Sequence, residues 1–393
     1  MNARLHATPE GATPLPMILR EPGGPGASSL DVSIVIPCLN EEPTIERCVA
    51  EAWAAIEEAR VGGEVLVVDN GSTDASAALA HRGGARVIHE PRRGYGRAYL
   101  TGLEHARGRT ILMGDADLTY DFRELPAFIS LARQGNDLVM GSRFRGRILP
   151  GAMPWHHRYI GNPILTGVLN LLYRSGVSDA HCGLRMVRAD ALERLRLRST
   201  GMEFASEMVI RARQARLRIA ETPITYAPRP GGSISKLKSL RDGLRHVRYM
   251  LAYAASGWFL VPALLLAAVG GALVTGVGPA PVSVPAGVLM LVAGGALAQA
   301  HLGLRLYRAL ALDPNERMRS ALRWALTRGA LAVGGMAVIA EVALAALLGE
   351  TTRRLTIGSH HGRMFSMLVA LTIVTLAATA WMAALRRTAR AAA

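Results

Sequence analysis

Two aspartates, Asp115 and Asp117, stand one residue apart directly after the apolar run Thr110–Met113. Such a run predicts a buried strand, so both carboxylates are expected at its carboxyl end. Carboxylates in this arrangement can converge on one divalent cation, and Mg²⁺ or Mn²⁺ prefers oxygen ligands of this kind and also accepts diphosphate oxygens. The alternative is a pair of solvated turn carboxylates without a metal, which the spacing alone does not exclude.

The strand before Asp115 is one of several that end in polar residues. The predicted strands and the segments after them are Val32–Pro37 with Cys38–Glu42, Glu64–Asp69 with Asn70–Asp74, and Ala85–His89 with Arg92–Arg97. Helix-like patterns separate them. Alternating strands and helices predict a parallel α/β sheet, and polar residues at the strand ends predict a ligand crevice along that edge.

Four motifs occur in order at compatible spacings: Pro37-x-x-Asn40-Glu41, Asp69-Asn70-Gly71-Ser72-x-Asp74, Gly94-x-Gly96-x-Ala98 and Asp115-Ala116-Asp117-Leu118. In this order the chain resembles the family 2 glycosyltransferases of the GT-A fold, and more closely the polyprenyl-phosphate hexose synthases. The resemblance covers about Val32 to Tyr249. It implies a Rossmann-like α/β catalytic domain at residues 31–235, after a flexible tail at residues 1–30.

The resemblance implies a nucleotide-sugar site at the strand ends. Asp69 would accept a hydrogen bond from the base, Glu41 or Asp115 would bind the ribose, and Asp117 would hold a metal on the diphosphate. The donor-binding set is Pro37, Asn40, Glu41, Asp69, Asn70, Gly71, Arg97 and Asp115, and the metal ligands are Asp115 and Asp117. Asn70 and Thr119 depart from the pattern, since many relatives carry a second Asp and some carry a metal-binding Gln there. The segment Gly94–Ala98 is either a plain turn or a loop that lines the diphosphate.

An acceptor half follows. The resemblance assigns the contacts with a lipid phosphate to Arg143 and to Arg158 with Asn162, and we expect Lys236 to bind the same phosphate. The apolar stretch Ile164–Tyr173 is too short to span a membrane and suits a helix in the lipid interface, although a core helix is the alternative. Glu207 would be the general base, with Asp115, Asp117 and Arg143 as the other catalytic residues. A phosphate monoester is already anionic at neutral pH, since its second pKa is about 6, so Glu207 is alternatively an orienting residue.

Beyond residue 235 the composition changes. Residues 236–257 predict a basic amphipathic helix beside a membrane. The region 258–393 contains four apolar stretches of near the ~20 residues that cross a bilayer: Trp258–Val277, Val282–Gly303, Gly329–Leu348 and Phe365–Leu385. They predict a transmembrane domain of four helices, against the alternative of buried core helices. The mean hydropathy of +0.22 agrees with this reading.

The chain carries a formal charge of +15. No helix-turn-helix, zinc-finger or RNA-binding signature accompanies it, so nucleic acid is not the expected partner. Arginines gather beside the apolar stretches, which predicts a multi-pass protein of the cell membrane with a cytoplasmic catalytic domain. Arg353, Arg354 and Arg363 lie on the predicted outside and argue against it. The cysteines Cys38, Cys48 and Cys182 lack metal-ligand spacing, and a reducing cytoplasm predicts no disulfide.

The sequence thus predicts a metal-dependent, inverting transfer of a hexose from a nucleotide sugar to polyprenyl phosphate. UDP-glucose is the favoured donor, because Leu240–Tyr249 resembles the juxtamembrane segment of dolichyl-phosphate glucose synthases. A processive polysaccharide synthase is an alternative, but Arg323-Trp324 lacks the Gln of the usual Gln-x-x-Arg-Trp motif. A membrane scaffold or flippase partner is another, and Glu341 in the third apolar stretch favours it. The oligomeric state stays open.

Overall fold

The computed structural model describes residues 30–230, 239–274 and 283–308, and its chain divides into two compact units, Met1–Met250 and Leu251–Ala393. The division falls inside the segment 236–257 that the sequence predicts as a juxtamembrane helix. Lys236 and the third and fourth apolar stretches lie outside the described residues. Each unit is described by itself below.

The first unit is built on a seven-stranded sheet in the order β3-β2-β1-β4-β6-β5-β7. The strands are β1 (Val32–Cys38), β2 (Gly63–Asp69), β3 (Arg86–His89), β4 (Thr110–Met113), β5 (Leu138–Ile148), β6 (Arg185–Arg188) and β7 (Ile219–Tyr226). The first four are mutually parallel, and the sequence places them to within one residue. The expectation of a wholly parallel sheet is wrong, because β6 runs antiparallel to both β4 and β5.

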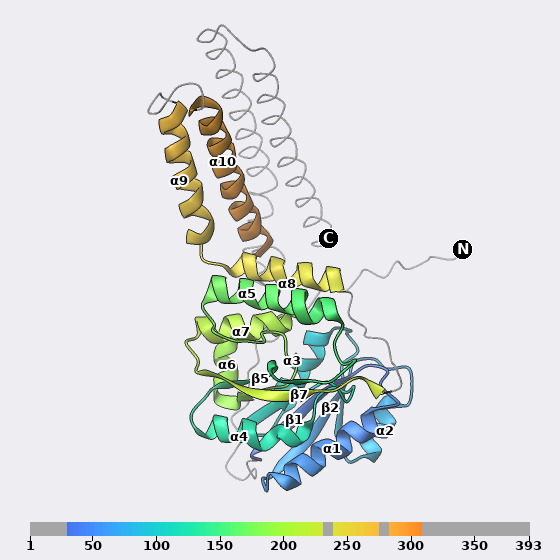
Figure 1. The fold of residues 1–393 in the computed structure, drawn as a ribbon. Helices are drawn as coiled ribbons and strands as arrows, with labels where there is room; N and C mark the ends of the chain where they lie inside the picture. The colour runs from blue at the N-terminus through green and yellow to red at the C-terminus, as the bar shows by residue number, and fades with distance from the viewer. Residues whose placement is uncertain (1–29, 231–238, 275–282, 309–393) are drawn as a thin grey trace, which may run out of the picture. The chain divides into compact units, whose positions relative to one another are not determined.

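Helices cover both faces of this sheet (Figure 1). On one face lie α1 (Ile45–Glu58), α2 (Ser76–Arg82) and α4 (Leu125–Arg133), and on the other lie α3 (Tyr95–His105), α6 (Ala189–Leu195) and α7 (Phe204–Gln214). The helices α5 (Asn162–Tyr173) and α8 (Ser239–Tyr253) lie beyond α7. The amphipathic face of α1 buries Ile45, Val49 and Ile56 against the sheet. Because both faces are covered, the central strands are apolar along their length, as parallel strands require.

The register of β1, β2 and β3 aligns the carboxyl ends of these strands. Cys38 pairs with Asp69, and Asp69 pairs with His89. The loops that follow β1 and β2 are tied to each other: Asn40 Oδ1 accepts a hydrogen bond from the Thr73 amide at 2.8 Å, and Ser72 Oγ accepts one from the Asn40 amide at 3.0 Å. Asn40 has φ 51°, a left-handed conformation that asparagine tolerates. The crevice edge is therefore preorganised by polar contacts between loops.

Helix α8 is amphipathic, and Leu244 is an apolar residue of its exposed side, with 56% of its surface exposed. The buried stripe consists of His246, Tyr249 and Met250, which follow helical spacing i, i+3, i+4. This side of α8 packs on the catalytic unit through hydrogen bonds, whereas Arg245 and Arg248 are exposed.

The second unit contains two described helices, α9 (Gly257–Val274) and α10 (Ser283–Tyr307). They pack closely at small residues: a Cβ on Gly270 would lie 2.7 Å from the Gly287 carbonyl oxygen, and one on Gly294 would lie 2.8 Å from that of Ala263. Small residues allow this close approach of two apolar helices. In the described ranges no single helix meets the length and hydropathy criteria of a membrane span, and only Asp242–Tyr253 with Gly257–Leu273 meets them, as a bent pair. The predicted four-helix transmembrane domain is therefore not supported.

Candidate active site

Asp115 follows β4 at the carboxyl edge, as predicted. Two tyrosines of α3 hold it: the Tyr95 and Tyr99 hydroxyls donate to Asp115 Oδ1 at 3.1 and 3.2 Å. Its Oδ2 atom faces Gly183, where a Cβ would lie only 2.8 Å away, so a side chain at position 183 would displace it. Desolvation by burial and then the charge of Asp117 raise the pKa of Asp115 above its ordinary value.

Asp117 is more deeply buried and has partners on both oxygens. Leu118 adopts φ 57°, and the turn it makes returns the Thr119 amide and hydroxyl to Asp117 Oδ1 at 3.1 and 2.6 Å. The Arg229 guanidinium, which follows β7, lies 2.5 Å from Asp117 Oδ2. Thr119, the position that departs from the family pattern, thus orients the carboxylate through its hydroxyl.

These two carboxylates fit a divalent cation of the Mg²⁺ or Mn²⁺ type. Both tyrosine hydrogen bonds go to Oδ1 of Asp115, which leaves Oδ2 as an available oxygen ligand. Arg229 places a positive charge on Asp117 Oδ2 and stands where a cation is favourable. No cluster of three or more metal-binding side chains is present in the described part of the chain, so a bound ion would need further ligands from substrate or water.

The donor residues of the sequence prediction gather along β1 and β2. Asp69 is buried, and its Oδ1 accepts from the Ser72 amide at 3.0 Å while its Oδ2 lies 3.1 Å from Nδ1 of His89. Glu41 and Gly71 lie in the loops that follow these strands, and the Glu41 amide donates to Ser76 Oγ at 2.8 Å. Pro37 lies within β1 itself, opposite Val68. Their assignment to a nucleotide sugar stays a prediction.

Asn70 has a structural task beside the predicted one. It is buried, its amide nitrogen donates to the carbonyl oxygens of Glu90 and Arg92, and its Oδ1 accepts from the Gly94 amide at 2.7 Å. One side chain therefore fastens the loop after β3 to the end of β2. An aspartate could not donate the two hydrogen bonds to the carbonyl oxygens, which explains why an amide suits this position.

The glycines of Gly94–Ala98 serve close packing. A Cβ on Gly94 would lie 2.4 Å from the Thr200 carbonyl oxygen, and one on Gly96 would lie 2.2 Å from that of Ser199. The Arg97 amide donates to the Thr200 oxygen at 3.1 Å, so this amide of the first turn of α3 is occupied. The segment is thus more than a plain turn. Arg97 is half-buried and makes no salt bridge with a described carboxylate, and its contact with a phosphate stays a prediction.

The acceptor residues lie in two different environments. Arg143 is buried and forms a bidentate pair with Asp179, with Nε–Oδ2 and Nη2–Oδ1 distances of 2.7 and 2.8 Å. Arg158 instead lies at the surface over the ring of Tyr159, and the neighbouring Asn162 begins α5. Their contact with a lipid phosphate is untested, and Lys236 is outside the described residues. The structure therefore leaves Arg158 open to a ligand and commits Arg143 to Asp179.

Glu207 is buried and both of its carboxylate oxygens accept hydrogen bonds. It is 1% exposed, its Oε2 accepts from the amides of Arg198 and Ser199, and its Oε1 accepts from the Tyr249 hydroxyl at 2.9 Å. Because these donors already occupy both carboxylate oxygens, the contacts favour an orienting role over the predicted role as a general base. Glu203, four residues before Glu207, precedes α7 as its N-cap residue.

The sequence prediction missed three residues at the site: Tyr95, Tyr99 and Arg229. The tyrosines are four residues apart on α3, so they share one helical face, and this spacing was an available signal. Arg229 had no such signal, because it reaches Asp117 across more than a hundred residues of sequence.

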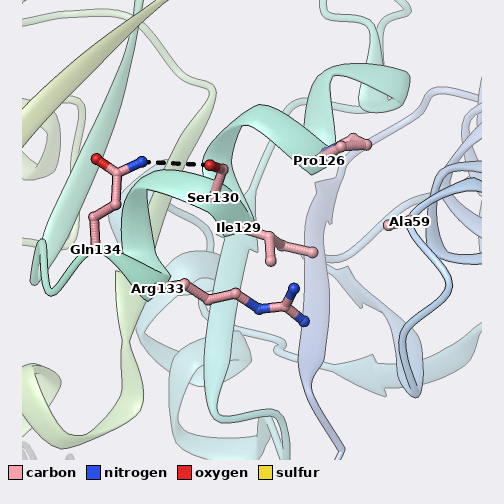
Figure 2. A pocket seen from close by; sticks show the side chains of 6 residues that line it. All are labelled: Ala59, Pro126, Ile129, Ser130, Arg133 and Gln134. Carbon is pink, nitrogen blue, oxygen red and sulfur yellow. Dashed lines mark hydrogen bonds between the residues drawn. The ribbon is translucent and has the colours of Figure 1, made fainter.

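A pocket also lies away from these carboxylates (Figure 2). It is lined by Ala59, Pro126, Ile129, Ser130, Arg133 and Gln134. Ala59 follows the end of α1 and lies four residues before the start of β2. The pocket is therefore at the amino ends of the parallel strands, opposite the carboxyl ends that carry the aspartates. The residues predicted for catalysis do not line it.

Comparison with known proteins decides the family. The family model for glycosyl transferase family 2 matches residues 33–196. The low-salt glycan biosynthesis hexosyltransferase Agl6 of Haloferax volcanii is 43% identical over 336 residues, which cover 81% of this chain and 79% of that protein. The chain belongs to the family 2 glycosyltransferases. An alignment of this length extends beyond the first unit into residues 251–393.

Two further relatives of this family 2 glycosyltransferase align with about half of it. An uncharacterized glycosyltransferase of Mycobacterium tuberculosis is 35% identical over 214 residues, 54% of this chain and 93% of that protein. Glycosyltransferase AglJ of Haloferax volcanii is 32% identical over 217 residues, 54% of this chain and 68% of that protein. Among solved structures, glucosyl-3-phosphoglycerate synthase of Mycobacterium tuberculosis aligns with a TM-score of 0.46 at 22% identity, over 61% of this chain and 89% of that one.

Proposed function

We propose that this glycosyltransferase moves one hexose from a nucleotide sugar to polyprenyl phosphate, with inversion at the anomeric carbon and with UDP-glucose as the donor. The observation that carries the proposal is the pair Asp115 and Asp117 at the end of β4, beside the guanidinium of Arg229. A site with two carboxylates and a cation suits a diphosphate with a divalent metal. The relative Agl6, whose name describes a hexosyltransferase of glycan biosynthesis, supports the sugar class.

The proposed reaction needs no general base. A phosphate monoester with a second pKa of about 6 is anionic at neutral pH, so its oxygen can attack the anomeric carbon directly while the nucleoside diphosphate departs. This agrees with the buried, fully hydrogen-bonded state of Glu207. A Mg²⁺ or Mn²⁺ ion held by Asp115 and Asp117 would neutralise charge on the departing diphosphate. Arg158 would bind the acceptor phosphate from the surface side.

We also propose that the enzyme works at the cytoplasmic face of the cell membrane. Exposed aromatic side chains support this placement: Trp155 and Tyr159 are each 67% exposed, beside the exposed Ile164 and Leu171 of α5. Aromatic and apolar side chains with neighbouring arginine are typical of a membrane interface. A cysteine replacing Ala280 should react with an impermeant thiol reagent from outside the cell. Labelling only after permeabilisation would refute the proposed arrangement, in which position 280 lies outside the cell and the catalytic domain lies at the cytoplasmic face.

The decisive experiment uses the purified full-length protein in lipid nanodiscs with Mn²⁺ and a panel of radiolabelled UDP- and GDP-hexoses. The expected result is release of nucleoside diphosphate and transfer of label to lipid only when polyprenyl phosphate is present. The Asp117→Asn variant serves as the inactive control. Label that enters a growing polymer, or release that does not depend on polyprenyl phosphate, would refute the proposal.

A further inference from the structure

Glu207 connects two parts of the catalytic unit that are far apart in sequence. On one side its Oε1 atom accepts the hydrogen bond from Tyr249 at 2.9 Å, and Tyr249 belongs to the buried face of α8. On the other side its Oε2 atom accepts the amides of Arg198 and Ser199 at 2.9 and 2.7 Å. The Arg211 guanidinium of the same helix also lies 3.7 Å from Oε1. A buried carboxylate with three hydrogen-bond donors and a nearby cation is held strongly, because each hydrogen bond to a charged group is worth about twice a neutral one.

The segment that Glu207 holds, residues 198–200, packs against the start of α3. The carbonyl oxygen of Thr200 accepts the Arg97 amide at 3.1 Å. Gly94 and Gly96 leave no room between the start of α3 and this segment, since a Cβ at either would lie within 2.4 Å of a carbonyl oxygen. A shift of the segment 198–200 therefore has to move the first turn of α3, because close-packed backbones transmit displacement.

The first turn of α3 in turn holds Asp115. Tyr95 and Tyr99 donate both of their hydroxyl hydrogen bonds to Asp115 Oδ1. A second contact joins the same parts: the ring of Phe204, at the start of α7, stacks on Tyr99 with centroids 5.5 Å apart and an interplanar angle of 8°. Glu207 lies on α7 as well, one turn after Phe204.

From this chain of contacts we infer that Glu207 is a positioning residue. It links α8 to the segment 198–200, against which the start of α3 packs, and thereby sets the position of Asp115 for binding metal and diphosphate. The inference rests on the proposed function for one point, the role of Asp115 as a metal ligand. It assigns Tyr249, Tyr95 and Tyr99 to the same network. The packing of α8 at Tyr249 and the position of the Asp115 carboxylate are then coupled. A change in one therefore alters the other.

The test measures binding of UDP to the full-length protein by isothermal titration, with and without Mn²⁺. If the donor panel selects a guanosine donor, GDP replaces UDP. Tyr249→Phe removes a single hydroxyl, on α8, which is not among the residues assigned to the donor, the metal or the acceptor. We expect Tyr249→Phe and Glu207→Gln to weaken the Mn²⁺-dependent gain in affinity by roughly three- to tenfold, the range of mutations along a coupled network. Binding without metal should stay at the parent value.

The matched control is Glu64→Gln. Glu64 is also a buried carboxylate with several donors, from Ser33, Arg86 and the Arg107 amide, but it lies at the start of β2, away from the strand ends. The Glu64→Gln variant should have lower thermal stability than the parent but the same Mn²⁺-dependent gain in affinity for UDP. If Glu207→Gln does not fold, Tyr249→Phe decides alone. An unchanged Mn²⁺ gain in Tyr249→Phe, or an equal loss in Glu64→Gln, would overturn the inference.

A double mutant cycle of Tyr249→Phe with Tyr95→Phe completes the test. Residues of one network give non-additive effects, so the double variant should lose no more of the Mn²⁺ gain than the stronger single variant. Additive losses would refute the coupling. Absent transfer to polyprenyl phosphate, with metal-dependent nucleotide binding intact, would refute only the proposed acceptor. Absent metal-dependent binding in the parent would refute the metal role of Asp115 and the inference with it.

Discussion

The guanidinium of Arg229 lies 2.5 Å from Oδ2 of Asp117, so one of the two carboxylates proposed to hold a metal is paired with a side-chain cation. Arg229 is partly exposed and Asp117 is buried. A buried carboxylate without a positive partner is costly, and this pair removes that cost when no metal is bound. A metal ion held by Asp117 would therefore compete with Arg229 for this oxygen.

The first prediction concerns Asp117. Asp117→Asn keeps the shape of the side chain but removes the charge, so we expect transfer to fall by about a thousandfold or more, as the loss of several kcal/mol of charge stabilisation requires. Initial rates in excess Mn²⁺ measure it. The control is Asp121→Asn, which breaks an exposed pair with Arg123 and should leave the rate near the parent value. Parent-like activity of Asp117→Asn would exclude the metal site.

A second prediction follows from the competition at Asp117. Arg229→Gln removes the cation that neutralises Oδ2, so Mn²⁺ should bind the protein without nucleotide roughly three- to tenfold more tightly, the effect of removing one nearby like charge. The midpoint temperature of thermal unfolding without metal should also fall, because Asp117 loses the partner of its buried charge. Titration of Mn²⁺ by electron paramagnetic resonance measures the affinity. Weaker metal binding in Arg229→Gln would show that Arg229 helps the metal and does not compete with it.

A third prediction separates Arg143 from a purely ligand-binding role. Asp179→Asn leaves the buried Arg143 guanidinium without its bidentate partner, which should destabilise the protein by about 3–5 kcal/mol. Chemical unfolding of the full chain measures the loss. Asp190→Asn provides the comparison, since its pair with Arg188 is exposed and should change stability by less than about 1 kcal/mol. Equal stability of the two variants would contradict the structural role of the pair.

A fourth prediction concerns the acceptor. Arg158→Gln removes a half-buried charge that lies over the ring of Tyr159 and forms no salt bridge with a carboxylate of the described residues, so stability should stay near that of the parent. The apparent KM for polyprenyl phosphate should rise about tenfold, because one charge-assisted hydrogen bond to phosphate is lost. Affinity for the nucleotide sugar should not change. Weaker donor binding with an unaltered acceptor KM would move Arg158 to the donor side.

The fifth prediction is a pH dependence at Glu124. Desolvation by burial raises the pKa of Glu124 from 4.5 to about 7, although its Oε1 accepts from the Thr225 amide, and its Oε2 has no hydrogen bond. The folded protein binds this proton more tightly than the unfolded chain does. The contribution of Glu124 to the free energy of unfolding is therefore greatest below pH 4.5 and falls as the pH rises toward 7.

Glu124→Gln should remove this dependence, because the neutral amide mimics the protonated acid. The full shift corresponds to about 3 kcal/mol, and partial exposure of the side chain reduces our expectation to about 1 kcal/mol between pH 5 and 7.5. Urea unfolding of parent and variant at both values measures the difference. A variant that loses as much stability as the parent over this range would show that Glu124 is not the responsible group.

The sequence alone determined the half of the fold that local patterns specify. Strands β1 to β4 are short apolar runs that end in polar residues, so their type, their ends and the placing of Asp69, Asp115 and Asp117 at one edge could be predicted. The resemblance to family 2 glycosyltransferases came from motifs in the same segments, and the match to Agl6 over 336 residues extends beyond them.

Only the tertiary structure decided how distant segments meet. The antiparallel entry of β6 between β4 and β5, the pair of Arg143 with Asp179 and the approach of Arg229 to Asp117 all join residues far apart in sequence. Hydrophobic periodicity specifies which face of an element is buried but not its neighbour. A buried carboxylate such as Glu207 likewise looks like a catalytic base until its donors are known, and those donors come from Arg198, Ser199 and Tyr249 on separate parts of the chain.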